Sequence, residues 1–285
     1  MAKILLDKNL TKTFLSKLWF NTTKWFSCFW EINLIKNIIN KYNLHFPILI
    51  KELNNHSWQW IYPINSLQEL NNLKLNLDLE YLVEEFIQWD EYSVMLFINN
   101  WKTVVFPPIF KWPTKILDNW KILHALLKNR SNIVDKNIDE KIRKISTDLW
   151  KIKWINWFIE IETIFDKKDW NLKIIEINPR ISWTTEISFL STNYSFTKLL
   201  NDLSKKWDIN QDEVFCENIV LEYPIVHNNP DFTEIKINIE WGKIIKNRCL
   251  RQHPPYIQKI LIEFDDIDSY NNFIIKNENL NENKL

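Results

Sequence analysis

The stretch "WFIEIETIFDKKDWNLKIIEINPR", residues 157–180, decides the fold, because it combines a predicted hairpin with an ordered set of polar side chains. Two apolar runs flank a turn at Asp169–Trp170, where a hairpin usually has Asp-Gly. Glu176 and Asn178 are two residues apart, so they share one face of their strand. Glu162 lies on the preceding strand. We therefore predict a two-stranded ribbon that presents carboxylate and amide oxygens.

Such oxygens are hard ligands of the kind that Mg²⁺ prefers. We predict a metal site at Glu162, Glu176 and Asn178, with Glu160 as a rival for Glu162 because it lies on the same face. The alternative is a charged sheet face with a structural salt bridge to Arg180. Taken alone, the hairpin favours that alternative; beside further ligand-binding residues, the metal site is favoured.

The tryptophan in this turn belongs to a pattern that runs through the chain. The 285 residues contain one Gly and 16 Trp, whereas average usage predicts about 20 Gly. Trp101, Trp120 and Trp170 occupy hairpin or turn positions that favour Gly, and Trp19 stands where a helix should end in Gly. These positions need a positive φ, which a bulky side chain tolerates badly.

Our hypothesis is that most of these tryptophans are glycines, encoded by UGA codons that the natural host translates as Gly. The nucleotide sequence tests it: UGG codons at Trp58, Trp60, Trp101 and Trp183 would exclude it. Trp30 and Trp241 fit the pattern less clearly, and we expect them to be genuine. The alternative is a truly Trp-rich protein that stacks nucleic-acid bases or sugars.

Composition restricts the function classes. The 36 basic and 36 acidic residues give a formal net charge of zero, so no overall charge favours nucleic acid or an anionic membrane. No apolar run has membrane-spanning length, and the N-terminus does not resemble a signal peptide. Three scattered cysteines argue against a disulfide framework or a cysteine-ligated metal. We expect a cytoplasmic protein with no nucleic-acid or membrane partner.

Further motifs precede the hairpin when Trp is allowed to stand for Gly. The chain offers "LDK" at 6–8, a buried strand "FPILIK" that ends at Lys51, the loop "SWQW" at 57–60, and "VEEFIQWDE" at 83–91. After them come the hairpin and "EINPRISWTTE" at 176–186. Neither a P-loop nor a dinucleotide-binding glycine pattern can be completed.

This ordered set, over roughly residues 5–205, resembles the ATP-grasp superfamily of ATP-dependent carboxylate ligases. Hairpins interleaved with helices agree with an α+β fold and not with a doubly wound parallel sheet. The resemblance implies two α+β lobes that hold ATP between antiparallel sheets. The family usually has a substrate domain before the "DK" segment. We expect that this domain is lost, that the start of the chain is miscalled, or that a partner chain supplies the domain. Two departures are Glu52, where the family commonly has Pro, and the segment 105–150, which shows no acceptor-substrate motif.

The resemblance also implies roles for individual residues. Lys8 and Lys51 bind nucleotide phosphates, and the backbone of Ser57, Trp58 and Trp60 closes over them. With indoles at 58 and 60, the chain as written should bind ATP poorly. The adenine lies along Glu84, Glu85, Phe86 and Ile87, with Glu84 as the better match for the carboxylate, and Glu91 binds the ribose. Arg180 and Lys51 are the predicted catalytic residues.

The implied reaction activates a carboxylate as an acyl phosphate with ATP and Mg²⁺ or Mn²⁺, for attack by an amine or a similar nucleophile. The alternatives are a non-catalytic ATP-binding module and a Trp-rich nucleic-acid-binding protein. The expected domains are a helical segment at 1–45, a small lobe with the phosphate loop at 46–110, and a large lobe with the metal site at 111–205. A β-rich segment at 206–275 and a disordered tail at 276–285 follow.

Overall fold

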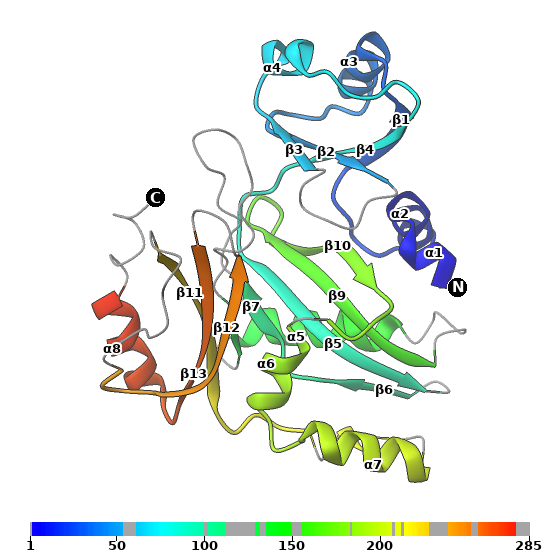
Figure 1. The fold of residues 1–285 in the computed structure, drawn as a ribbon. Helices are drawn as coiled ribbons and strands as arrows, with labels where there is room; N and C mark the ends of the chain where they lie inside the picture. The colour runs from blue at the N-terminus through cyan, green and yellow to red at the C-terminus, as the bar shows by residue number, and fades with distance from the viewer. Residues whose placement is uncertain are drawn as a thin grey trace. The chain divides into compact units, whose positions relative to one another are not determined.

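A computed structural model describes most of the chain. The described residues are 2–53, 61–99, 102–111, 129–131, 135–149, 156–182, 184–206, 209–211, 214–227, 239–251 and 256–277. Within these ranges, no helix is both long enough and apolar enough to cross a membrane. Figure 1 shows how helices and strands alternate along the chain.

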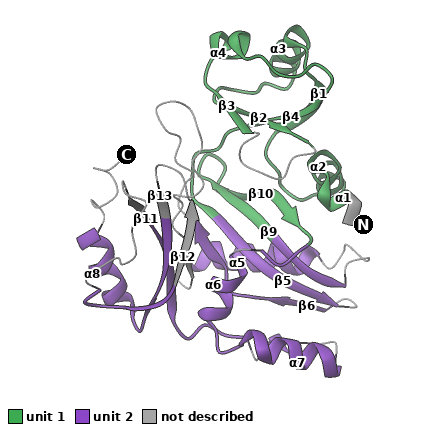
Figure 2. Cartoon of the chain, in the orientation of Figure 1, with its two compact units in different colours: residues 1–91, 113–124, 161–179 green, residues 92–112, 125–160, 180–285 purple. Residues whose placement is uncertain are grey.

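The chain forms two compact units, and each is built from three separate segments (Figure 2). Unit 1 contains residues 1–91, 113–124 and 161–179, and unit 2 contains residues 92–112, 125–160 and 180–285. Strand β9 (Trp157–Asp166) contributes residues to both units. The hairpin that decided the sequence interpretation is therefore divided between them.

Unit 1 contains a four-stranded antiparallel sheet with the strand order β1-β4-β2-β3. Its strands are β1 (Trp25–Phe29), β2 (Ile48–Glu52), β3 (Ile61–Ile64) and β4 (Glu80–Glu85). Helices α3 (Ile32–Lys41) and α4 (Leu67–Asn72) cover one face (Figure 1). Their apolar side chains pack on alternate residues of the strands, including Ile48, Ile50, Tyr81 and Val83. Side chains alternate along a strand, so Lys51 and Glu84 belong to the opposite face.

The rest of unit 1 brings a helix pair together with part of the hairpin. Helices α1 (Ala2–Leu6) and α2 (Lys8–Lys17) both contact strand β10 (Asn171–Asn178). Asp7 caps α2, because its carboxylate accepts a hydrogen bond of 2.9 Å from the Leu10 N–H. The N–H of Ile174 donates to the Asn21 carbonyl at 2.8 Å and fixes the loop after α2 on β10.

Unit 2 contains most of a second, larger sheet, whose strand order is β10-β9-β5-β7-β8-β11-β13-β12, with β6 paired to β5. Its strands are β5 (Glu91–Asn99), β6 (Lys102–Val105), β7 (Ile109–Lys111), β8 (Asn129–Ser131), β11 (Ile219–His227), β12 (Lys243–Arg251) and β13 (Tyr256–Phe264). Its helices are α5 (Lys136–Asp148), α6 (Thr185–Leu190), α7 (Phe196–Lys206) and α8 (Ile267–Asn277). One of its cores contains the aromatic side chains of Phe97 on β5, Phe158 on β9 and Phe189 on α6, together with Phe106, which follows β6.

The structure confirms the α+β fold class and most of the expected elements. The sequence pattern predicts helices at 8–18, 31–42 and 196–206, and α2, α3 and α7 occupy these positions. Ser66 followed by Glu69 is a capping-box pattern that predicts a helix start, and in the structure the Glu69 N–H donates to Ser66 Oγ at 3.2 Å. Strand β1 was not predicted. Helix α8 continues to Asn277, two residues into the expected tail, and the remaining tail lies outside the described residues.

The described tryptophans differ from one another in backbone conformation and in burial. Trp19 and Trp170 have φ values of 63° and 55°, in the left-handed region that favours glycine. Trp19 is 93% exposed and Trp170 is 69% exposed. Trp30, in contrast, is buried at 6% exposure and packs edge-on against Tyr81. Trp58, Trp60, Trp101, Trp120 and Trp183 lie outside the described residues.

Candidate nucleotide site

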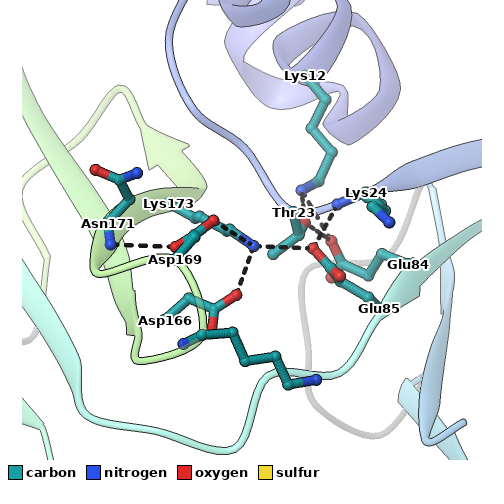
Figure 3. Close-up of polar contacts among 10 residues, drawn as sticks. Lys12, Thr23, Lys24, Glu84, Glu85, Asp166, Asp169, Asn171 and Lys173 are labelled. Atoms are coloured by element: carbon teal, nitrogen blue, oxygen red, sulfur yellow. Dashed lines mark hydrogen bonds and ion pairs between the residues drawn. The ribbon is translucent and has the colours of Figure 1, made fainter. Parts of the chain in front are cut away.

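Glu84 is the centre of a buried ionic cluster on the open face of the unit 1 sheet. Its side chain is 1% exposed, and two donors meet its Oε2 atom. Lys12 Nζ from helix α2 lies 2.8 Å from Oε2, and the Thr23 hydroxyl donates to Oε2 at 2.8 Å (Figure 3). Lys12 Nζ also donates to Thr23 Oγ1 at 2.5 Å. Lys51 of β2 forms an ion pair with the other oxygen, Oε1.

Charges rather than burial decide the ionisation of this carboxylate. Burial acts to raise the pKa of Glu84, but the charges and hydrogen bonds of Lys12 and Lys51 outweigh it and lower the pKa to about 2. Burial lowers the pKa of Lys12, and Glu84 offsets only part of that effect. For Lys51 burial also acts to lower the pKa, but Glu84, Glu176 and Glu91 raise it overall. The carboxylate is therefore ionised between two buried ammonium groups.

The structure gathers several of the predicted site residues into this cluster. Burial lowers the pKa of Lys8, and the nearby charge of Glu176 opposes that effect. Lys51 and Glu84 also act on the Lys8 pKa, and Glu91 acts on the Lys51 pKa. The predicted residues Lys8, Lys51, Glu84, Glu91 and Glu176 are therefore close enough to influence one another's charge. Three lysines, counting Lys12, converge in unit 1.

The end of strand β4, where the adenine is expected, is held by backbone hydrogen bonds. The Glu85 N–H donates to the Lys24 carbonyl at 3.0 Å, and the Lys24 N–H donates to Glu85 Oε1 at 2.8 Å. The Phe86 N–H donates to the Pro47 carbonyl at 3.1 Å. Ile87 is buried at 9% exposure. The Glu85 carboxylate is thus engaged by its neighbours, and Glu84 is the buried carboxylate of the pair.

Lys173 connects the hairpin to this strand end within unit 1. Its Nζ lies 2.6 Å from Asp166 Oδ2, 3.4 Å from Asp169 Oδ2 and 3.4 Å from Glu85 Oε1 (Figure 3). Burial acts to lower the pKa of Lys173, but its hydrogen bond to Asp166 and the charge of Glu85 raise it overall. One ammonium group therefore joins the turn of the hairpin to the strand that ends at the predicted adenine position.

We expect Lys173→Met to lower the free energy of unfolding by about 1–3 kcal/mol, because it leaves Asp166 and Glu85 without their shared cation. Urea titration followed by circular dichroism measures this loss. Lys168→Met, an exposed lysine in the same turn, is the matched control and should change the value by less than about 0.5 kcal/mol. Equal losses in the two variants would contradict the bridging role of Lys173.

The predicted metal ligands form a sparse donor set. Glu162, Glu176 and Asn178 are all half-buried. Among the described residues, no three His, Cys, Asp or Glu side chains gather as a metal site. Two carboxylates and one amide suit Mg²⁺, which keeps several waters and takes phosphate oxygens as further ligands. The chemistry of the donor set therefore fits the expected ion.

Glu160, the rival metal ligand, belongs to a hydrogen-bond network inside unit 2. Its Oε1 accepts from the Ser93 hydroxyl at 2.6 Å and from the Thr184 hydroxyl at 2.6 Å. Ser182 Oγ lies 2.8 Å from Thr184 Oγ1. The carboxylate is 3% exposed and anchors the segment that follows Arg180. These contacts favour Glu162 over Glu160 as the ligand.

The remaining predicted residues are Arg180, which is exposed, and the loop residues Ser57, Trp58 and Trp60, which lie outside the described residues. The sequence interpretation missed Lys12 and Thr23. Lys12 follows Lys8 by four residues, a spacing that places both on one helix face, so helical periodicity could have identified it. Thr23 lies in an irregular segment, where no periodicity could have revealed it.

Comparisons with known proteins found similar structures but no similar sequence. No protein-family model matches the chain, and no curated protein matches its sequence. An L-amino acid ligase from Bacillus licheniformis matches with a TM-score of 0.69 at 16% identity, over 96% of this chain and 70% of that one. Biotin carboxylase from Campylobacter jejuni matches with 0.69 at 11% identity, over 96% of this chain and 66% of that one.

A third similar structure is carboxyaminoimidazole ribonucleotide synthase from Aspergillus clavatus, complexed with ATP. Its TM-score is 0.73 at 14% identity, over 95% of this chain and 72% of that one. All three are ATP-grasp enzymes. The chain therefore has the ATP-grasp fold.

Proposed function

We propose that this protein is an ATP- and Mg²⁺-dependent ligase that joins a carboxylate to an amine or a similar nucleophile. The observation that carries the proposal is the buried cluster in which Lys8, Lys12 and Lys51 converge near Glu84 and Glu176. Glu91 also acts on Lys51, so the cluster holds carboxylates as well as lysines. Three lysines that converge at one place suit a polyphosphate, because each ammonium group can pair with a phosphate oxygen.

The proposed chemistry follows from positioning and charge. An oxygen of the substrate carboxylate attacks the γ-phosphorus of ATP, the bond from that phosphorus to the bridging oxygen breaks, and ADP leaves. The amine nitrogen then attacks the acyl carbon and loses a proton, while phosphate leaves with the C–O bonding electrons. Lys8 and Lys51 would hold the phosphates, and Arg180 would hold the acyl phosphate through its planar guanidinium.

The nucleotide base and the metal ion would be held by the other predicted residues. The adenine would lie along Glu84–Ile87, and Glu91 would bind the ribose. Glu162, Glu176 and Asn178 would hold Mg²⁺ or Mn²⁺, which supplies neutralisation of phosphate charge when it is bound. The loop at Ser57–Trp60 would close over the phosphates.

The test is acyl-dependent release of ADP by the purified full chain. ATP and Mg²⁺ are offered with a panel of carboxylic acids, and hydroxylamine traps any acyl phosphate as a hydroxamate. The Trp58→Gly/Trp60→Gly variant is tested in parallel, and we expect it to be the more active form. ADP release that depends on a carboxylate supports the ligase. Nucleotide binding without such release in either form supports the non-catalytic ATP-binding module instead.

Lys51→Met should weaken binding of a non-hydrolysable ATP analogue with Mg²⁺ by about 100-fold, because it removes a buried ammonium group from the proposed phosphate position. Isothermal titration calorimetry measures the affinity. Lys74→Met removes an exposed lysine of the same unit and should leave the affinity within about twofold. An unchanged affinity in folded Lys51→Met protein would contradict the assignment.

The nucleic-acid-binding alternative requires that the natural protein has tryptophan, not glycine, at these positions. Salt-dependent binding of single-stranded oligonucleotides by the chain as written, together with UGG codons, would support it. Trp30 is buried beside Tyr81 and is not available to stack on a base. The balanced charge of the chain also favours the ligase over a nucleic-acid-binding protein.

A further inference from the structure

The two oxygens of Glu84 have different partners, and this difference has a functional consequence. Oε2 receives Lys12 Nζ at 2.8 Å and the Thr23 hydroxyl at 2.8 Å, and these groups are also hydrogen-bonded to each other at 2.5 Å. Oε1 forms an ion pair with Lys51. Lys12 and Thr23 therefore hold one oxygen of the carboxylate, and Lys51 pairs with the other.

Lys12 and Thr23 are more deeply enclosed than Lys51. Lys12 is 2% exposed and Thr23 is 4% exposed, whereas Lys51 is 8% exposed. Helix α2 carries Lys12, and strand β2 carries Lys51, so the two cations reach Glu84 from different elements. Lys51 is therefore the more accessible of the two lysines that pair with Glu84.

Breaking a buried ion pair is costly when the remaining charge has no other partner. Suppose that Lys51 were the single cation paired with Glu84. A phosphate that bound the Lys51 ammonium group would then leave the buried Glu84 carboxylate without a positive partner. Lys12 removes that cost, because Glu84 keeps one cation and one hydroxyl donor on Oε2. The arrangement thus leaves Lys51 able to exchange one anion for another.

We propose that Lys12 and Thr23 are positioning residues of the nucleotide site, which neutralise and hold Glu84 so that Lys51 can transfer from this carboxylate to a nucleotide phosphate. This inference rests on the proposed ATP-dependent function and extends it to two residues behind the site. Neither residue touches the nucleotide. Both act through Glu84, and their effect must therefore disappear when the Glu84 charge is removed.

The test is a double-mutant cycle on the affinity of the full chain for the Mg²⁺ complex of a non-hydrolysable ATP analogue, measured by calorimetry. Lys12→Met should weaken binding by about 10- to 100-fold, and Thr23→Val by about 3- to 10-fold. In a Glu84→Gln background, Lys12→Met should change the affinity by less than about threefold, because no carboxylate competes for Lys51. Lys17→Met, on an exposed position of the same helix, is the control and should have no effect.

The outcomes separate this inference from the proposed function. If the wild-type chain binds the nucleotide and Lys12→Met binds it equally well, the positioning role is overturned and the proposed function stands. Equal losses from Lys12→Met in both backgrounds also overturn it, because Lys12 would then act independently of Glu84. If neither the wild-type chain nor the Trp58→Gly/Trp60→Gly variant binds the nucleotide, the proposed function and this inference both fail.

Discussion

Glu84→Gln should lower the free energy of unfolding by about 3–5 kcal/mol, the largest change that we expect from a single charge-removing substitution in unit 1. The variant keeps the size of the side chain but leaves Lys12 and Lys51 buried together without a carboxylate. Removing one partner of a buried ion pair typically has a cost of this size. Urea unfolding at pH 7, followed by circular dichroism, measures the loss.

Glu84→Gln should also change how the free energy of unfolding depends on pH. Because the pKa of Glu84 is lowered from 4.5 to about 2 in the folded protein, its contribution is complete above pH 4.5 and is lost as the pH falls through about 2. A shift of this size corresponds to about 3 kcal/mol. Wild-type protein should lose that amount between pH 5 and pH 2 in excess of the loss shown by Glu84→Gln.

Glu80→Gln, at the other end of strand β4, is the matched control. Glu80 is half-buried, and its replacement should cost less than about 1 kcal/mol. The ionic cluster is contradicted if Glu84→Gln is no less stable than Glu80→Gln, or if the two variants lose stability in parallel as the pH falls.

Replacing tryptophan by glycine should have opposite effects at different positions of this chain. Trp19→Gly should raise the free energy of unfolding by about 0.5–1 kcal/mol, since it relieves a left-handed backbone that costs an L-residue about 1–2 kcal/mol. Trp170→Gly should stabilise less, because Trp170 packs edge-on against Phe165. Trp30→Gly should cost at least about 3–5 kcal/mol, because it empties a buried site beside Tyr81.

Thermal and urea unfolding of the three variants measure this contrast, and Trp30→Gly acts as the internal control for the other two. Destabilisation by Trp19→Gly of more than about 1 kcal/mol would show that the indole is an integral part of the helix end. It would also remove the structural support for glycine at that position. The two left-handed tryptophans and the buried one are thus separated by a single measurement.

The sequence predicted the fold well where periodicity and turn chemistry agree. Helix α2, the capped helix α4 and the hairpin strands β9 and β10 follow from apolar spacing and turn positions that act over a few residues. Strand β1 was not predicted, because "WFSCF" has no alternation of apolar and polar residues, and its pairing with β4 depends on residues far away in the sequence. Local patterns cannot report such a partner.

The sequence predicted only part of the candidate site, because the rest depends on contacts between positions that are distant in the sequence. Lys8, Lys51 and Glu84 were identified by the order of motifs, and the structure brings them into one charged cluster. The interaction of Lys12 and Thr23 with Glu84 joins positions more than 60 residues apart in sequence. It is determined by how α2 lies on the sheet. The engagement of Glu160 by Ser93 and Thr184 is likewise a tertiary contact that strand alternation could not distinguish from a metal ligand.

The division of unit 1 into three sequence segments has a consequence for biosynthesis. The four-stranded sheet is complete once residue 85 has been made, but its Lys173 bridge arrives only with the hairpin that ends near residue 179. At roughly 5–20 residues per second, the ribosome takes several seconds to supply the intervening chain. During that interval the strand end at Glu85 lacks the Lys173 ammonium group that holds it in the finished protein. A fragment that stops at residue 91 should therefore resemble a translation intermediate rather than a domain, with greater sensitivity to proteases than the same residues in the finished protein.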